Sequence, residues 1–170
     1  MKSILLGTAA LALTAGVAMA DTVRLGTEGA YPPYNFINDK GEVDGFEREL
    51  GDELCKRAEL TCEWVTNDWD SIIPNLTSGN YDAIIAGMSI TEEREEVVDF
   101  TQGYTPPSPS AYAAMSDGVD LTGGIIAAQT ATIQANHVVD TGATLVEYPT
   151  PEENITAVKS GGAEAVRGAK

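Results

Sequence analysis

Residues 81–95, YDAIIAGMSITEERE, join a strand-like run to the beginning of a helix, and this junction indicates the fold class. The run from 81 to 87 has the composition of a strand and ends in small residues. Ser89 and Glu92 have the S-x-x-E spacing of a capping box, which predicts a helix start with free backbone N–H groups just beyond the strand. Because ligands of α/β sheets bind at the carboxyl ends of strands, this junction is a candidate binding site.

Arg94 is the one basic residue in this stretch, and four glutamates surround it: Glu92, Glu93, Glu95 and Glu96. The arginine could form surface ion pairs with these neighbours, each contributing a few tenths of a kcal/mol. A guanidinium beside free N–H groups could instead offer a bidentate fork to a carboxylate, helped by the Ser89 hydroxyl. The second reading predicts a receptor for the carboxylate of a small ligand.

The first half of the chain alternates strand-like runs with helical patterns, which predicts an α/β architecture. We expect strands in VRLGT (23–27) and CEWVT (62–66), and a helix over 45–58 with Phe46, Leu50 and Leu54 on one apolar face. A second helix is expected in NDWDSIIPNLTSG (67–79), capped by Asp68 or Asp70, with Pro74 in its first turn and Gly79 at its end.

The second half repeats the alternation after a proline- and serine-rich segment at 105–115, a candidate crossing between two lobes. GGIIAAQTATIQANHVV (123–139) reads as a strand, a tight turn and a helix. A further strand precedes Thr150, which forms a capping box with Glu153 around Pro151 at the first helical position.

Residues 1–20 have the layout of a cleavable signal peptide: Lys2, a short apolar run and Ala18-Met19-Ala20 before Asp21. A membrane anchor is the weaker alternative, because glycines and threonines interrupt a run that is short for a span. Without Lys2, 9 basic and 26 acidic residues give a net charge of −17. Such a surface repels phosphate backbones and argues against nucleic acid and anionic membranes as partners; a solubility or high-salt trait without meaning for the ligand is the alternative explanation of the acidity.

Cys55 and Cys62 are the only cysteines, and in an exported chain they predict a disulfide that closes a small loop. A metal site is not expected, because two thiols and the distant His137 give too few ligands at zinc-like spacing. We interpret His137 as an ordinary surface or helix residue, and we expect no cofactor.

Four ordered motifs, GTEGAYPPYNF, GFERELGDELCKRA, NDWDSIIPNLTSGNYDAII and GMSITEERE, resemble the extracytoplasmic solute-binding proteins for polar amino acids, of the lysine/arginine/ornithine, histidine and glutamine type (family 3). The likeness covers nearly the whole mature chain. It implies a two-lobed α/β clamp of type II in the periplasm. This clamp closes on one free amino acid and delivers it to the membrane permease subunits of an ABC importer, and we expect it to act as a monomer.

The resemblance also assigns roles to individual residues. Arg94 would grip the ligand carboxylate with Ser89 and the backbone near Gly87, while the rings of Trp69 and Tyr31 would pack against the ligand side chain. Core packing is the alternative for each ring. Glu28 would meet the far end of the ligand and favour arginine, lysine, ornithine or histidine over glutamate. In the second lobe Thr132 and Gln134 would contact the ligand, in a turn where the family usually has glycine at the position of Ala131.

The resemblance breaks near the end of the sequence. The family pattern continues further and places an aspartate for the α-ammonium about where Ala169 stands, so we expect a truncated chain with lobe 1 mostly present and lobe 2 incomplete. The expected boundaries are a signal peptide at 1–20, lobe 1 at 21–108, an interlobe hinge strand at 109–115 and a partial lobe 2 at 116–170. The alternatives are a binder of glutamine or another polar amino acid, a sensor domain, a periplasmic dehydratase-like enzyme with Glu28 as general acid, and a fragment without function.

Overall fold

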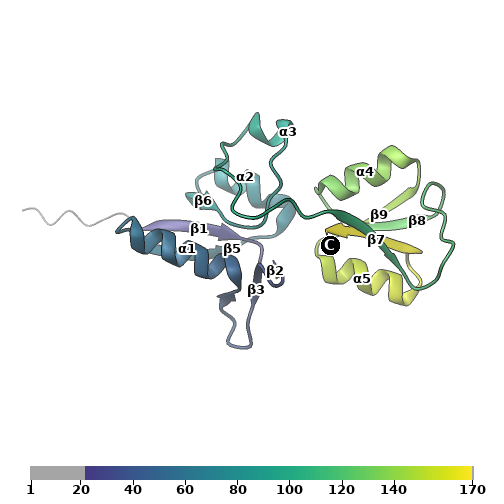
Figure 1. The fold of residues 1–170 in the computed structure, drawn as a ribbon, viewed down its shortest axis with the longest axis horizontal. Coiled ribbons are helices and arrows are strands. Elements are labelled where there is room, and N and C mark those ends of the chain that lie inside the picture. The colour runs from purple at the N-terminus through teal and green to yellow at the C-terminus, as the bar shows by residue number, and fades with distance from the viewer. Residues whose placement is uncertain (1–21, 170) are drawn as a thin grey trace, which may run out of the picture.

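The computed structural model describes residues 22–169, which fold into two α/β lobes joined by an extended segment (Figure 1). The proposed signal peptide, 1–20, lies outside the described residues. Within the described part, no helix is both long and apolar enough to cross a membrane. The mixed α/β fold class agrees with the sequence prediction.

The first lobe is built on a parallel sheet with the strand order β5-β1-β6. The three strands are β1 (Val23–Thr27), β5 (Cys62–Thr66) and β6 (Ala83–Ile84). An antiparallel sheet beside it contains β2 (Ala30–Tyr31), β3 (Asn35–Ile37) and β4 (Val43–Asp44). The helices of this lobe are α1 (Phe46–Arg57), the 3-10 turn η1 (Trp69–Ser71), α2 (Ile72–Thr77) and α3 (Glu92–Glu95). Ile72, Tyr81 and Ala86 form its buried cluster.

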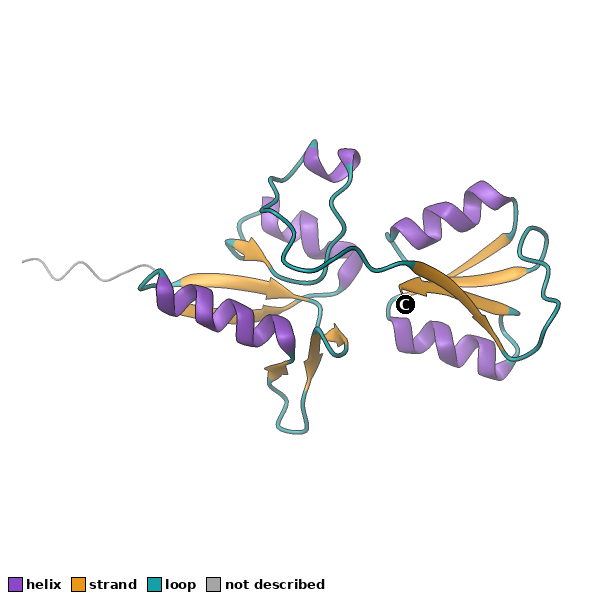
Figure 2. Ribbon diagram, viewed as in Figure 1, coloured by secondary structure: helices purple, strands orange, loops and turns teal. Residues whose placement is uncertain are grey.

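The second lobe contains one sheet with the order β7-β10-β8-β9 and a helix on each face. Its strands are β7 (Ser110–Ala114), β8 (Ile125–Gln129), β9 (Thr144–Tyr148) and β10 (Ala165–Ala169). Figure 2 shows α4 (Ile133–Thr141) and α5 (Pro151–Ser160) on opposite sides of this sheet. Alternate residues of β8 therefore supply two cores: Ile126 and Ala128 pack with α4, and Ala127 packs with α5.

Two details of the first lobe contradict the sequence-based expectation. Helix α3 begins after Thr91, whose side chain accepts a hydrogen bond from the backbone N–H of Arg94, so Thr91 and not Ser89 is the N-cap. The apolar face expected for α1 is largely exposed, at 43% for Phe46 and 52% for Leu54. The residues of α1 that are buried are Glu47 and Gly51.

Trp64 explains the orientation of α1. A Cβ atom at Gly51 would lie 2.5 Å from the Trp64 ring, so the helix can approach β5 only through a residue without a side chain. Gly51 therefore faces the sheet, whereas Phe46 and Leu54 are exposed and Leu50 is half-buried.

Other local predictions agree with the structure. Thr150 and Glu153 form the capping box of α5, and Pro151 is its first residue. The helix over 72–77 is followed by Gly79, whose φ of 76° ends it in a left-handed conformation. The 3-10 turn has Asp68 as its N-cap but without a side-chain hydrogen bond, and Ser71 precedes α2. Cys55 and Cys62 form a disulfide between α1 and β5, as predicted.

Candidate functional site

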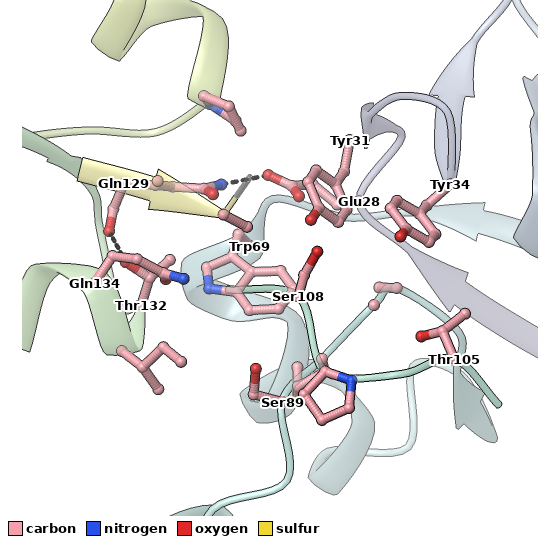
Figure 3. A pocket seen from close by; sticks show the side chains of 18 of the residues that line it. Glu28, Tyr31, Tyr34, Trp69, Ser89, Thr105, Ser108, Gln129, Thr132 and Gln134 are labelled. Atoms are coloured by element: carbon pink, nitrogen blue, oxygen red, sulfur yellow. Dashed lines mark hydrogen bonds between the residues drawn. The ribbon is translucent and has the colours of Figure 1, made fainter. Parts of the chain in front are cut away.

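A cleft of about 640 Å³ lies between the two lobes. All eight residues that the sequence suggested for ligand binding line it: Glu28, Tyr31, Trp69, Gly87, Ser89, Arg94, Thr132 and Gln134. In Figure 3, Gln129, Thr132 and Gln134 approach from the second lobe and Glu28 and Tyr31 from the first, with Trp69 between them. The cleft is open and mainly apolar, so its few charged groups determine which ligands fit it.

Arg94 presents a positive charge without a carboxylate partner. Its Nη1 donates to the carbonyl of Ser89 (2.8 Å), and its Nη2 lies 3.4 Å from the carbonyl of Ala131 in the other lobe. None of the ion pairs among residues 22–169 involves Arg94, although glutamates surround it in sequence. Burial lowers the pKa of Arg94, because desolvation disfavours its charge. Within the described part of the chain the side-chain hydrogen bonds of Arg94 go to carbonyl oxygens, and a half-buried cation of this kind can accept an anionic ligand group.

Trp69 and Tyr31 form aromatic walls of the cleft. The guanidinium carbon of Arg94 lies 5.5 Å from the Trp69 ring centroid, and Trp69 Nε1 donates to the Ala131 carbonyl (3.1 Å). Tyr31 stacks on Tyr34, with ring centroids 5.0 Å apart. These rings offer flat surfaces for an aliphatic or guanidinium stem.

Glu28 follows β1 directly and carries the negative charge of the cleft. Gln129, the last residue of β8, donates from Nε2 to the Glu28 carboxylate and to the Pro149 carbonyl (2.9 Å). Burial raises the pKa of Glu28 to about 7, although the hydrogen bond from Gln129 opposes the rise. Glu28 is therefore a partly desolvated carboxylate that a cation would stabilise in its ionised form.

Thr132 and Gln134 occupy the turn and first residues of α4. The Thr132 hydroxyl donates to the Gln129 carbonyl (2.6 Å) and accepts from the Ala135 N–H, so it caps the helix. Gln134 Nε2 donates to the Ser110 hydroxyl (3.0 Å). Ala131 has a φ of 57°, a left-handed conformation that glycine adopts more easily, which gives a physical reason for the glycine expected there.

Gln129, Tyr34, Tyr104 and Arg167 also line the cleft, and the sequence analysis did not assign them to it. Gln129 could have been identified, because it ends a strand and its side chain lies at the carboxyl edge of the sheet. Ala169, where the family pattern expects an aspartate, ends β10 and lines the cleft as well. His137 is exposed on α4 and is not among the lining residues of this cleft.

Comparisons with known proteins identify a family and several relatives. Residues 23–164 match the model of the bacterial extracellular solute-binding proteins, family 3. The octopine-binding periplasmic protein of Rhizobium meliloti is 42% identical over 119 residues, 69% of this chain and 40% of the relative. The L-arginine-binding protein of Pseudomonas aeruginosa is 34% identical over 180 aligned positions, which cover 97% of this chain and 68% of the relative.

A solved structure of a periplasmic His/Glu/Gln/Arg/opine family-binding protein from Silicibacter pomeroyi, in complex with lysine, is 75% identical. It superposes with a TM-score of 0.83 over 86% of this chain and 67% of that one. The chain spans less than half of the length of the octopine-binding relative and of a lysine/arginine/ornithine-binding periplasmic protein of Escherichia coli.

Proposed function

We propose, because the chain belongs to the bacterial extracellular solute-binding proteins of family 3, that it binds a free polar amino acid in the cleft between its lobes. Its fold is that of the type II periplasmic binding proteins, of which it represents part of the length. The observation that carries the proposal is the half-buried Arg94 guanidinium, which has carbonyl partners and an aromatic neighbour but no ion pair with a carboxylate among residues 22–169.

The cleft has opposite charges contributed by different elements, which fits an amino acid with a cationic side chain. Arg94 on α3 would bind the α-carboxylate, and Glu28 after β1 would pair with the distal ammonium or guanidinium group. The rings of Trp69 and Tyr31 would enclose the methylene stem between the two charged ends. We therefore place arginine, lysine, ornithine and histidine before glutamine, and all of these before glutamate, which Glu28 would repel.

The same proposal includes cleavage of residues 1–20, a periplasmic location, and delivery of the bound amino acid to an ABC importer. The names of the relatives support an extracytoplasmic binding role. We also propose that the clamp acts as a monomer, with lobe 1 at 21–108, a hinge at 109–115 and a partial second lobe at 116–170. Strand β7 lies in this hinge range and pairs with β10.

A dehydratase-like enzyme is the second candidate, because a buried glutamate with a raised pKa also suits a general acid. Isothermal titration calorimetry with arginine, lysine, ornithine, histidine, glutamine and glutamate separates the two. Saturable heat for the cationic amino acids, lost in Arg94→Ala, supports binding. Absence of heat for all six ligands, or turnover of a prephenate-like acid, would contradict the proposed function.

A further inference from the structure

Glu47 is a fully buried carboxylate that does not line the cleft. It is the second residue of α1, and none of the ion pairs among residues 22–169 includes it. A buried carboxylate needs hydrogen-bond donors in place of water. The N-terminus of α1 supplies part of the compensation, because the helix dipole is positive there. Two side chains supply the remaining hydrogen-bond donors, and each of them also binds the backbone of a loop beside the cleft.

The first side chain is Asn35, which is also fully buried. Its Nδ2 donates to Glu47 Oε2 (2.6 Å), and its Oδ1 accepts from the backbone N–H of Gly29 (2.7 Å). Because the Gly29 N–H requires an acceptor, the amide oxygen of Asn35 must face Gly29 and its NH₂ group must face Glu47. Glu47 can satisfy this contact only as an acceptor.

The second side chain is Tyr104, which lies near the end of the range proposed for lobe 1 and lines the cleft. Its hydroxyl donates to Glu47 Oε1 and accepts from the backbone N–H of Gly87 (3.2 Å). A tyrosine hydroxyl has one proton, so the contact with Gly87 leaves that proton for Glu47. Burial, together with the neighbouring carboxylate, raises the pKa of Tyr104 and keeps the hydroxyl protonated. Glu47 is again the acceptor.

The two glycines bound by these side chains lie in the loops that position Glu28 and Arg94, the charged residues of the cleft. Gly29 follows Glu28, and Gly87 precedes Ser89, whose carbonyl supports Arg94. Both glycines have left-handed backbones, with φ of 73° and 60°. A Cβ atom at Gly87 would lie 3.2 Å from the Tyr31 ring, so this loop also sets the position of an aromatic wall.

We propose that Glu47 is a positioning residue for the cleft: its two oxygens hold the loops at Gly29 and Gly87, and through them Glu28 and Arg94, without contact with the ligand. The inference rests on the proposed function for its effect on amino acid binding. Its structural part does not, because the amides of Gly29 and Gly87 can be observed in the absence of ligand.

Glu47→Gln tests the proposal with little change of shape. A glutamine side chain has one acceptor oxygen, so its NH₂ group would face Asn35 as donor against donor, or it would face Tyr104, whose hydroxyl proton would then lose its acceptor. Tyr104→Phe removes the hydrogen bonds to Glu47 and Gly87 and leaves those of Asn35 in place. Tyr81→Phe is the matched control, because it also removes a buried hydroxyl, one that donates to the Ile72 carbonyl; neither Tyr81 nor Ile72 lines the cleft.

Amide hydrogen exchange measured by NMR, together with calorimetry using arginine, gives the readout. In Glu47→Gln we expect exchange to accelerate about tenfold at Gly29 or at Gly87, whichever belongs to the contact that is lost, and arginine to bind about tenfold more weakly, as for the loss of one hydrogen bond. In Tyr104→Phe we expect faster exchange at Gly87 alone. Tyr81→Phe should leave the exchange rates of both amides and the affinity for arginine as they are in the wild type.

Two results would overturn the inference. If Glu47→Gln accelerates hydrogen exchange at neither Gly29 nor Gly87 by more than Tyr81→Phe does, Glu47 has only a general stabilising role. If amide exchange accelerates at either glycine while the affinity for arginine stays unchanged, the loop positions do not control binding. A wild-type chain that binds no amino acid at all would refute the proposed function instead, and the exchange measurements would still decide whether Glu47 holds the two glycines.

Discussion

Replacing Glu28 with glutamine should stabilise the folded chain at neutral pH. The pKa of Glu28 is raised from 4.5 to about 7, with burial as the largest cause. A group whose pKa is raised by folding contributes stability below its unfolded pKa, and this contribution is lost as the pH rises through the folded pKa. The unfolded chain therefore releases this proton near pH 4.5, whereas the folded chain keeps it until about pH 7. The difference corresponds to about 3 kcal/mol of stability, which is lost as the pH rises from about 4.5 to about 7, at roughly 1.4 kcal/mol per pKa unit.

Urea unfolding of the wild type and of Glu28→Gln at several pH values between 5 and 8 measures this effect. The stability of the variant relative to the wild type should grow by about 2–3 kcal/mol over this range, because glutamine has no proton to lose. Glu147→Gln, at an exposed position of β9, controls for the loss of one negative charge from an acidic protein. If the unfolding free energies of Glu28→Gln and Glu147→Gln change with pH in parallel, Glu28 is solvated. Its proposed role as a desolvated partner for cations would then be wrong.

Three further outcomes are expected. Arg94→Ala should weaken arginine binding at least a hundredfold in calorimetry, since it removes a charge-assisted pair; wild-type affinity would exclude Arg94 as the carboxylate receptor. Arginine affinity in the wild type should rise about tenfold from pH 6 to pH 8 as Glu28 loses its proton, and a flat profile in fluorescence titrations would argue against pairing with that carboxylate. Ala169→Asp should strengthen arginine binding by about ten- to a hundredfold by restoring a partner for the α-ammonium, and equal affinities would show that the end of β10 lies outside the bound ligand's reach.

The residues of the cleft were largely predictable because they follow from a general rule about α/β sheets. Glu28 follows β1 and the Arg94 segment follows β6, so parallel pairing brings them to the same edge. Gln129 obeys the same rule as the last residue of β8, but the sequence analysis gave weight only to the turn after it. Its contact with Glu28 depends on how the two lobes meet, and no local pattern specifies that arrangement.

The errors within the first lobe arose where tertiary packing overrides a local spacing. Ser89 and Thr91 each precede a plausible helix start, and only the extended backbone of Thr91, with its side chain bound to the Arg94 N–H, decides between them. In α1 the leucine spacing indicated the buried face, yet the Trp64 ring requires Gly51 on that side. The network on Glu47 was not visible for the same reason, because its partners are 12 and 57 residues away in sequence.

The position of β10 in the second sheet has a consequence for biosynthesis. Residues 165–169 are inserted between β7 and β8, and β10 is the only strand that pairs with β7 among residues 22–169. While a ribosome still holds residues 165–169, β7 has no partner, and one edge of β8 is open to pairing with other chains. The second lobe can therefore complete its sheet only after translation of this region ends, so a factor that shields nascent chains should matter more for this lobe than for the first.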